Sequence, residues 1–165
     1  MAPDHSDPDV YVEVLLTVTD PSGFASTSSV NMYLNNSQGT IGNLIKNPGM
    51  ELNTVLPDTP DNWIKGWFGN HDQVWTYPVL GDASQRAAKI EITRYVSGDA
   101  KWAFDPVSVV ENTPYIFSDS YQSNIVSDVT VNIGFANGTH SFYTLGILAA
   151  SPVWQNFTRT FTTPA

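Results

Sequence analysis

Short runs in which apolar and polar residues alternate recur along the chain, with turn-forming residues between them. Val10, Val12 and Val14 alternate with Tyr11 and Glu13, which is the two-residue period of a half-buried strand. A convincing helical period is missing throughout, so the pattern predicts an all-β chain, either a sandwich or a jelly roll. The later runs predict strands over 25–34, 43–51, 73–80, 87–96, 100–110, 114–122, 128–136, 141–148 and 153–162.

Clusters of Pro, Gly, Asn and Asp separate these runs. The first such cluster, Asp20-Pro21-Ser22-Gly23, has the residue preferences of a type I turn and predicts a β-hairpin at the N-terminus. The other predicted turns lie at 57–62, 97–99, 111–114 and 136–139.

Three units follow from this pattern: a hairpin over 1–34, a polar linker over 35–42 and a β-rich domain over 43–165. The hairpin resembles the last two strands of an immunoglobulin-like repeat of bacterial surface proteins, whose earlier strands are missing here. A lone two-stranded hairpin is marginally stable in water. It therefore docks on the main domain or on a partner, or it is the end of a longer protein, and we favour the longer protein.

The composition excludes several classes of function. Seven Lys and Arg against 16 Asp and Glu give a formal charge of −9, which disfavours binding to nucleic acid and to anionic membranes. No window approaches the run of about 18 apolar residues that membrane insertion needs. Because the chain has no cysteine, disulfides, thiolate metal sites and cysteine nucleophiles are excluded. No secretion signal is visible in the first residues, Met1-Ala2-Pro3-Asp4.

Two motifs bracket the domain: Asn-Leu-Ile-Lys-Asn-Pro-Gly-Met-Glu at 43–51 and Trp-Gln-Asn-Phe-Thr-Arg-Thr-Phe-Thr-Thr-Pro at 154–164. They resemble the first and penultimate strands of β-jelly-roll carbohydrate-binding modules of families four, nine, sixteen and twenty-two. Pro-Asp-Asn-Trp at 60–63 and Asn-Thr-Pro-Tyr-Ile-Phe-Ser at 112–118 resemble further motifs of that group. Residues 97–102 and 117–121 are similar to modules that precede bacterial polysaccharide deacetylase domains.

The resemblance implies a jelly roll over 43–165, an extracellular or cell-surface location and a non-catalytic role. In the family, a further strand that carries an Asp-Asp or Asp-Asn pair closes the sheet, and this chain stops before it. The jelly roll is therefore expected to lack its last strand. Either one sheet edge is open, or the N-terminal hairpin fills the gap.

Aromatic residues are the main candidates for ligand contact, because indole and phenol rings offer large flat faces to the C–H faces of sugars. Trp67 and Trp75 flank the polar segment Gly69-Asn70-His71-Asp72, and Trp75 and Tyr77 share one strand face. Other rings are assigned to the core: Trp63, Tyr115, Phe117, Trp154 and Phe161. The full set of ligand candidates, with the polar residues expected to bond sugar hydroxyl groups, is Trp67, Trp75, Tyr77, Trp102, Tyr121, Gln122, Asn124 and Arg94.

Two acidic residues have specific expectations. Glu51 matches the glutamate with which jelly-roll modules of this type bind a structural Ca²⁺, so the resemblance implies a calcium site there. The aspartate that completes such a site lies on the missing strand. Asp119 stands where the family has an apolar residue, and it is expected either to pair with Arg94 or Lys101 or to contact a ligand.

Catalysis has little support in the sequence. The Gly-x-Ser-x-Gly, His-Glu-x-x-His and phosphate-loop patterns are all missing. A glycosidase uses paired carboxylates, but in a chain this acidic the four candidates are best explained as solvated residues: Asp99, Asp105, Asp119 and Asp128.

The sequence thus predicts a non-enzymatic module that binds a polysaccharide or oligosaccharide and targets an attached extracellular enzyme to it. The alternative is a structural or adhesive cell-surface module that self-associates through an open sheet edge.

Overall fold

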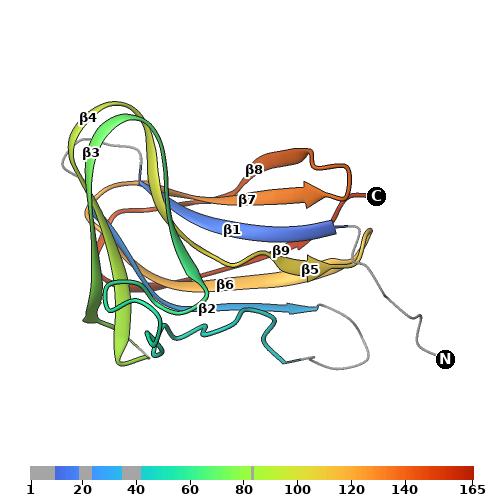
Figure 1. The fold of residues 1–165 in the computed structure, drawn as a ribbon, viewed down its shortest axis with the longest axis horizontal. Coiled ribbons are helices and arrows are strands. Elements are labelled where there is room, and N and C mark those ends of the chain that lie inside the picture. The colour runs from blue at the N-terminus through green and yellow to red at the C-terminus, as the bar shows by residue number, and fades with distance from the viewer. Residues whose placement is uncertain (1–9, 19–23, 35–41, 83) are drawn as a thin grey trace.

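The computed structural model describes residues 10–18, 24–34, 42–82 and 84–165. These residues form an all-β, antiparallel structure (Figure 1), so none of them belongs to a helix that could cross a membrane. The strands are β1 (Val10–Val18), β2 (Phe24–Leu34), β3 (Trp63–Leu80), β4 (Arg86–Phe104), β5 (Val107–Val109), β6 (Pro114–Ser123), β7 (Ser127–Phe135), β8 (His140–Leu148) and β9 (Ser151–Thr162).

Alternation of buried and partly exposed residues explains why these segments form strands. In β7, Ser127, Val129, Val131 and Ile133 are buried while the residues between them are mostly more exposed. Successive side chains of a strand point to opposite faces, so one face of β7 enters the core. The strands expected over 114–122, 128–136, 141–148 and 153–162 are all present, with bounds shifted by one or two residues.

The strands pair in the order β8-β7-β1-β4-β2-β6-β9, with β3 on β4 and β5 on β1. The long strand β4 connects two groups of strands, which we call the β1–β7–β8 arm and the β2–β6–β9 arm. Its first half, Ala88–Glu91, pairs with β2, and its second half, Ala100–Ala103, pairs with β1. In Figure 1 the β3–β4 pair stands at one end of the molecule, and the arms extend from it.

Both arms contribute to one hydrophobic cluster. Val131 of β7 and Phe117 of β6 belong to it, together with Trp63 and Phe104, whose rings meet edge to face at 5.8 Å. Four of the five aromatic residues expected in the core are buried; the fifth, Trp154, is half-buried.

The N-terminal strands β1 and β2 do not pair with each other, as the two strands of the expected hairpin would. β1 pairs with β7, β5 and β4, whereas β2 pairs with β4 and β6. Val12 and Met32 are fully buried in the common cluster. Residues 10–34 are therefore part of the same β-structure as 43–165. The predicted turn at 20–23 and most of the predicted linker lie outside the described residues.

Residues 43–51 were expected to form a strand, and they form a loop instead. Asn43 Oδ1 accepts hydrogen bonds from the backbone N–H groups of Met32 (3.0 Å) and Ile45 (3.2 Å). Asn47 and Met50 have positive φ angles of 49° and 57°, which a strand does not contain. The asparagines thus satisfy backbone groups that a strand would have paired with a neighbour.

Candidate binding site at the bend of the β3–β4 ribbon

β3 and β4 form a long two-stranded ribbon that bends sharply near its middle, where both strands arch over in Figure 1. Gly69 and Gly98 are cross-strand partners at this bend, with φ angles of 100° and 95°. A Cβ atom on Gly98 would lie 1.7 Å from the carbonyl oxygen of Phe68. Only glycine allows this conformation together with such a close approach.

Ser97-Gly98-Asp99 is therefore not the turn that was expected from its composition. The strand continues through it, and register shifts next to it, between Asn70 and His71 and between Asp72 and Gln73, complete the bend. Such bulges strengthen local twist and curvature, so the ribbon folds back on itself at this point.

His71 links the two strands next to the bend through hydrogen bonds. Its Nε2 atom lies 3.2 Å from the carbonyl oxygen of Phe68 and 2.8 Å from that of Asp99. Because both partners are acceptors, Nε2 carries the proton. The side chain is buried, and Nδ1 has no hydrogen-bond partner among the described residues. This role of His71 could not be predicted from the sequence, because the bend itself was not expected.

Trp67 and Trp75 meet across the bend. Their ring centroids are 5.7 Å apart, and the ring planes are inclined by 64°. Trp67 is 60% exposed and Trp75 is half-buried, with its Nε1–H directed to the carbonyl oxygen of Lys101 at 3.5 Å. Phe68, beside Trp67, is 72% exposed. The bend therefore presents aromatic surface to solvent.

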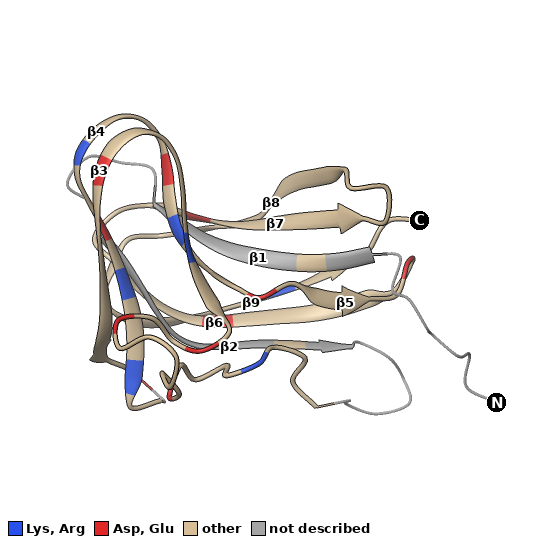
Figure 2. Cartoon of the chain, in the orientation of Figure 1, with Lys and Arg blue, Asp and Glu red and all other residues tan. Residues whose placement is uncertain are grey.

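Polar side chains also lie on the ribbon next to the bend. The guanidinium group of Arg94 donates two hydrogen bonds to the carboxylate of Asp72, at 2.7 and 2.9 Å, and a longer one to Asn70 Oδ1. These bonds hold the pKa of Asp72 below its usual range. Figure 2 shows both signs of charge interspersed along the ribbon. The bend thus combines flat rings with donors and acceptors suited to hydroxyl groups.

Three predicted ligand residues lie in the interior instead. Trp102 is 1% exposed and donates its indole N–H to Lys89 O, and Tyr77 and Tyr121 are each 7% exposed. Trp75 and Tyr77 share a strand face as expected, but that face turns toward the core. The buried rings of Trp102, Tyr77 and Tyr121 do not offer a stacking face in this conformation and are not part of the candidate site.

The remaining polar candidates are not at the bend. Gln122 belongs to β6 and donates a hydrogen bond to the carbonyl oxygen of Pro152, at the start of β9. Asn124 follows β6 and is exposed. Of the predicted residues, Trp67 and Trp75 contact each other, and Arg94 lies on the same ribbon, where it pairs with Asp72. The expectation that Asp119 pairs with Arg94 or Lys101 is not met by their ion pairs, because Arg94 pairs with Asp72 and Lys101 with Asp99.

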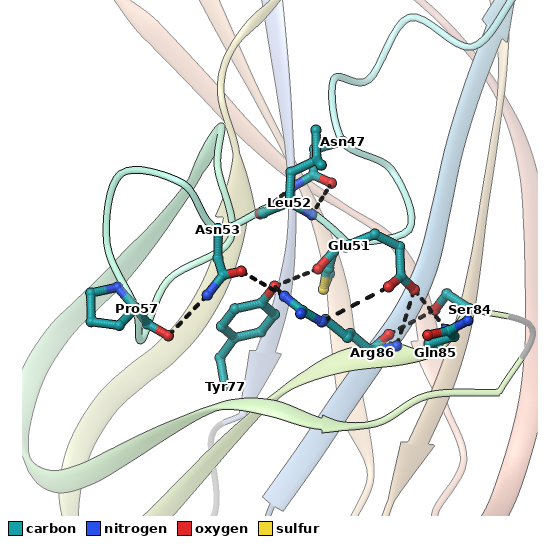
Figure 3. Close-up of polar contacts among 10 residues, drawn as sticks. Asn47, Glu51, Leu52, Asn53, Pro57, Tyr77, Ser84, Gln85 and Arg86 are labelled. Carbon is teal, nitrogen blue, oxygen red and sulfur yellow. Dashed lines mark hydrogen bonds and ion pairs between the residues drawn. The ribbon is translucent and has the colours of Figure 1, made fainter.

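A second polar cluster lies at the other end of the ribbon, beside the turn that joins β3 to β4 (Figure 3). We name Glu51, Asn53, Tyr77 and Arg86 the anchor cluster. Glu51 Oε1 accepts the backbone N–H groups of Gln85 (2.6 Å) and Arg86 (3.1 Å). Arg86 donates to Asn53 Oδ1 at 2.6 Å and to the Tyr77 hydroxyl group at 3.3 Å. The Tyr77 hydroxyl group in turn donates to Met50 O at 2.5 Å.

This arrangement does not fit the calcium site implied for Glu51. One oxygen of its carboxylate is committed to two N–H donors, and the other faces the Arg86 guanidinium group at 3.9 Å. A calcium ion needs six to eight oxygen ligands and would lie beside that positive charge. The described residues also contain no group of three His, Cys, Asp or Glu side chains placed to hold a metal ion. Calcium binding at Glu51 stays a prediction from the resemblance alone.

The main hollows of the surface lie elsewhere. One, of about 280 Å³, is lined by Leu44, Lys46 and Asp105 with residues 106–108, and a smaller one of about 140 Å³ lies against Trp63 and residues 55–62. Neither contains an exposed aromatic ring that could cover a ligand.

The four carboxylates considered for glycosidase chemistry are spread over different elements. Asp99 lies on β4 and pairs with Lys101, Asp105 follows β4, and Asp119 and Asp128 lie on β6 and β7. Comparison of the chain with protein-family models, curated proteins and solved structures finds no match.

Proposed function

We propose that this chain is a non-catalytic carbohydrate-binding module that holds an attached extracellular enzyme on a polysaccharide or oligosaccharide. The observation that supports this proposal is the Trp67–Trp75 pair, which is held at the bend of the ribbon with one ring 60% exposed. Rings fixed in a rigid two-stranded element lose little entropy when a ligand stacks on them.

The polar groups on the same ribbon match the chemistry of a sugar. A pyranose ring has C–H faces, which pack on indole, and peripheral hydroxyl groups, which both donate and accept. Asp72 and Asn70 supply acceptors, and Arg94 supplies donors. A few such contacts on an open surface give weak binding, with dissociation constants on the order of micromolar to millimolar.

The jelly-roll class and the cell-surface location belong to the same proposal. Two arms that share one hydrophobic cluster are compatible with a jelly roll, and the motif residues Trp63 and Tyr115 lie in that cluster, where the resemblance implies that they should. In this proposal the N-terminal strands, which pair with β4 and β6, take the place of the closing strand of the family.

Affinity electrophoresis and isothermal titration against glucans, xylans, chitin and peptidoglycan fragments test the proposal. We expect at least one glycan to retard the folded protein. Trp67→Ala should weaken that binding at least tenfold, which corresponds to about 1.4 kcal/mol.

Phe142→Ala provides the matched control, because Phe142 is 62% exposed on β8 and is thus as accessible as Trp67. It should leave affinity unchanged. Equal loss in both variants would show nonspecific hydrophobic adsorption, and no retardation by any glycan would refute the proposal.

A structural or adhesive module is the second candidate, and the edge strands favour it. Phe142 and Ile147 on β8, and Val153 on β9, are 60–68% exposed on strands that end the pairing order. Exposed apolar edges are templates for strand addition. Concentration-dependent assembly in size-exclusion chromatography, abolished by Ile147→Lys, would support this candidate, and a monomer at all concentrations would exclude it.

A further inference from the structure

The two N-terminal strands hold the fold together although they come from one end of the chain. β1 pairs with β7 over Val10–Thr17 on one side and with β5 and β4 on the other. β2 likewise pairs with β4 on one side and with β6 on the other. Both strands are therefore central in their sheets.

The other pairings among the described residues are β3 with β4, β6 with β9 and β7 with β8. In the pairing order, the β7–β8 pair reaches the ribbon through β1, and the β6–β9 pair reaches it through β2. Two-stranded pairs are marginally stable alone in water. Without residues 10–34, the strands of 43–165 therefore have two gaps, one between β7 and β4 and one between β4 and β6, and each gap has the place of one strand.

The positions between the strands fit residues 10–34 specifically. Val12 and Met32 are completely buried where their strands enter, and each strand bonds backbone groups on both sides. The same segment in any other copy of the chain has the same residues in the same register. It would fill the gaps equally well, because residues 10–34 precede the rest of the fold as one continuous piece.

We propose that this chain exchanges the β1–β2 segment with a second copy, so that each copy completes the sheets of the other. Reciprocal exchange closes a dimer, whereas exchange in one direction produces a chain of copies. The proposal is independent of glycan binding. Its consequence is that two or more ribbon bends are joined in one particle, which raises the avidity for any repetitive ligand.

Cysteine cross-linking tests this exchange directly, because the native chain has no cysteine. Val12 and Ile133 are cross-strand partners. Cα atoms of such partners are about 4.5–5.5 Å apart, which is within disulfide range. Copies carrying Val12→Cys and isotope-labelled copies carrying Ile133→Cys are unfolded, mixed, refolded together at high concentration and oxidised. We expect a disulfide-linked dimer whose junction joins positions 12 and 133.

The matched control replaces Ile133→Cys with Val129→Cys. Val129 is equally buried on β7 but pairs with Leu16. It therefore lies about 13 Å along the strand from the partner of Val12, beyond disulfide reach. The 12–133 mixture should yield at least tenfold more mixed dimer than the 12–129 mixture, and equal yields would overturn the proposal.

A single chain carrying both Val12→Cys and Ile133→Cys completes the test. If it forms its internal disulfide while the 12–133 mixture gives no more dimer than the control, the segment stays in its own chain and exchange is refuted. If it forms neither an internal disulfide nor one between copies, the β1–β7 register is wrong and the proposal fails with it. Native mass spectrometry of the unmodified chain gives a readout without substitution. Refolding at high concentration should produce dimers that persist on dilution, and monomers under all conditions would contradict exchange.

Discussion

The anchor cluster joins a loop to the turn end of the β3–β4 ribbon, whereas the bend lies within the ribbon, and the side chains of the two regions differ in what they contact. In the anchor cluster the Tyr77 hydroxyl group, the Glu51 carboxylate and the Arg86 guanidinium group all bond to other parts of the chain. At the bend, Trp67 and Phe68 project largely into solvent, and Arg94 and Asp72 form an exposed ion pair.

The difference separates the residues that carry the family resemblance from the residues that form the candidate site. The side chains of the 43–51 motif hold its loop in place: Asn43 bonds β2, Asn47 bonds within the loop, and Glu51 bonds the backbone at the start of β4. The bend contains the exposed aromatic surface and little of that motif. The comparison therefore predicts that substitutions in the anchor cluster change stability without changing binding, and that side chains at the bend do the reverse.

The backbone of the bend should give the largest effect. Gly98→Ala places a Cβ atom 1.7 Å from Phe68 O at a φ angle of 95°, so the two strands must separate. We expect a loss of about 3 kcal/mol or more in the free energy of unfolding, together with loss of glycan binding. Urea unfolding followed by Trp fluorescence measures the first, and titration calorimetry the second.

Gly138→Ala is the control for conformation alone. Gly138 also has a positive φ angle, of 80°, but a Cβ atom there would meet nothing within 4 Å. Its cost should be about 1–2 kcal/mol, with unchanged binding. If the two variants were equally destabilised, the close approach of the strands at the bend would not matter.

Tyr77→Phe should have an intermediate effect on the other region. Removal of the hydroxyl group leaves Met50 O without its donor and Arg86 without one acceptor. An unsatisfied buried carbonyl group costs about 1–3 kcal/mol, which lowers the melting temperature by about 2–4 °C for each kcal/mol in a chain of this size. Affinity for glycan should stay the same, and scanning calorimetry with parallel binding measurements tests both statements.

Tyr143→Phe is the matched substitution. Tyr143 is half-buried on β8, and its hydroxyl group has no hydrogen bond to a described residue. Stability should change by no more than about 0.5 kcal/mol. A loss of glycan affinity in Tyr77→Phe without loss of stability would return Tyr77 to the ligand site that the sequence predicted.

Much of the strand content could be predicted from the sequence, because alternation within β6, β7 and β8 directly reflects one buried face. The partners of β1 and β2 could not, since long-range pairing leaves no local pattern. Residues 97–99 were misjudged because Gly98 is as suited to a bent strand as to a turn. In 43–51 the family resemblance implied a strand, but the side-chain bonds of the asparagines replace the strand pairing.

The candidate site shows the same limit. Trp67 and Trp75 could be identified because they flank a polar segment, and their contact follows from the bend between them. Strand parity placed Trp75 and Tyr77 together but could not say which face was inward. Phe68 and Asp72 were not among the predicted site residues. Phe68 is an exposed ring next to Trp67. Asp72 is the carboxylate opposite Arg94 in the ribbon register.

The Arg94–Asp72 ion pair should give the smallest effect. Hydrogen bonds from Arg94 lower the pKa of Asp72, so the carboxylate favours the folded state only while it is charged. This contribution is present above the usual Asp pKa of about 3.9 and is lost as the pH falls through the lower folded-state pKa. Arg94→Gln should reduce stability slightly at neutral pH and not at all in strong acid. Because the pair is exposed, added salt should shrink the difference.

Carboxyl chemical shifts followed by NMR through an acid titration measure this directly. In Arg94→Gln the pKa of Asp72 should return toward its usual value. Asp61 is an internal control, because its pKa is lowered by hydrogen bonds from the Thr54 hydroxyl and backbone N–H groups and from Val55 N–H, in the loop beside the ribbon. Asp61 should titrate identically in both proteins. A shift of Asp61 along with Asp72 would mean that the bend and the anchored loop respond as one unit, and the contrast between the two regions would then not hold.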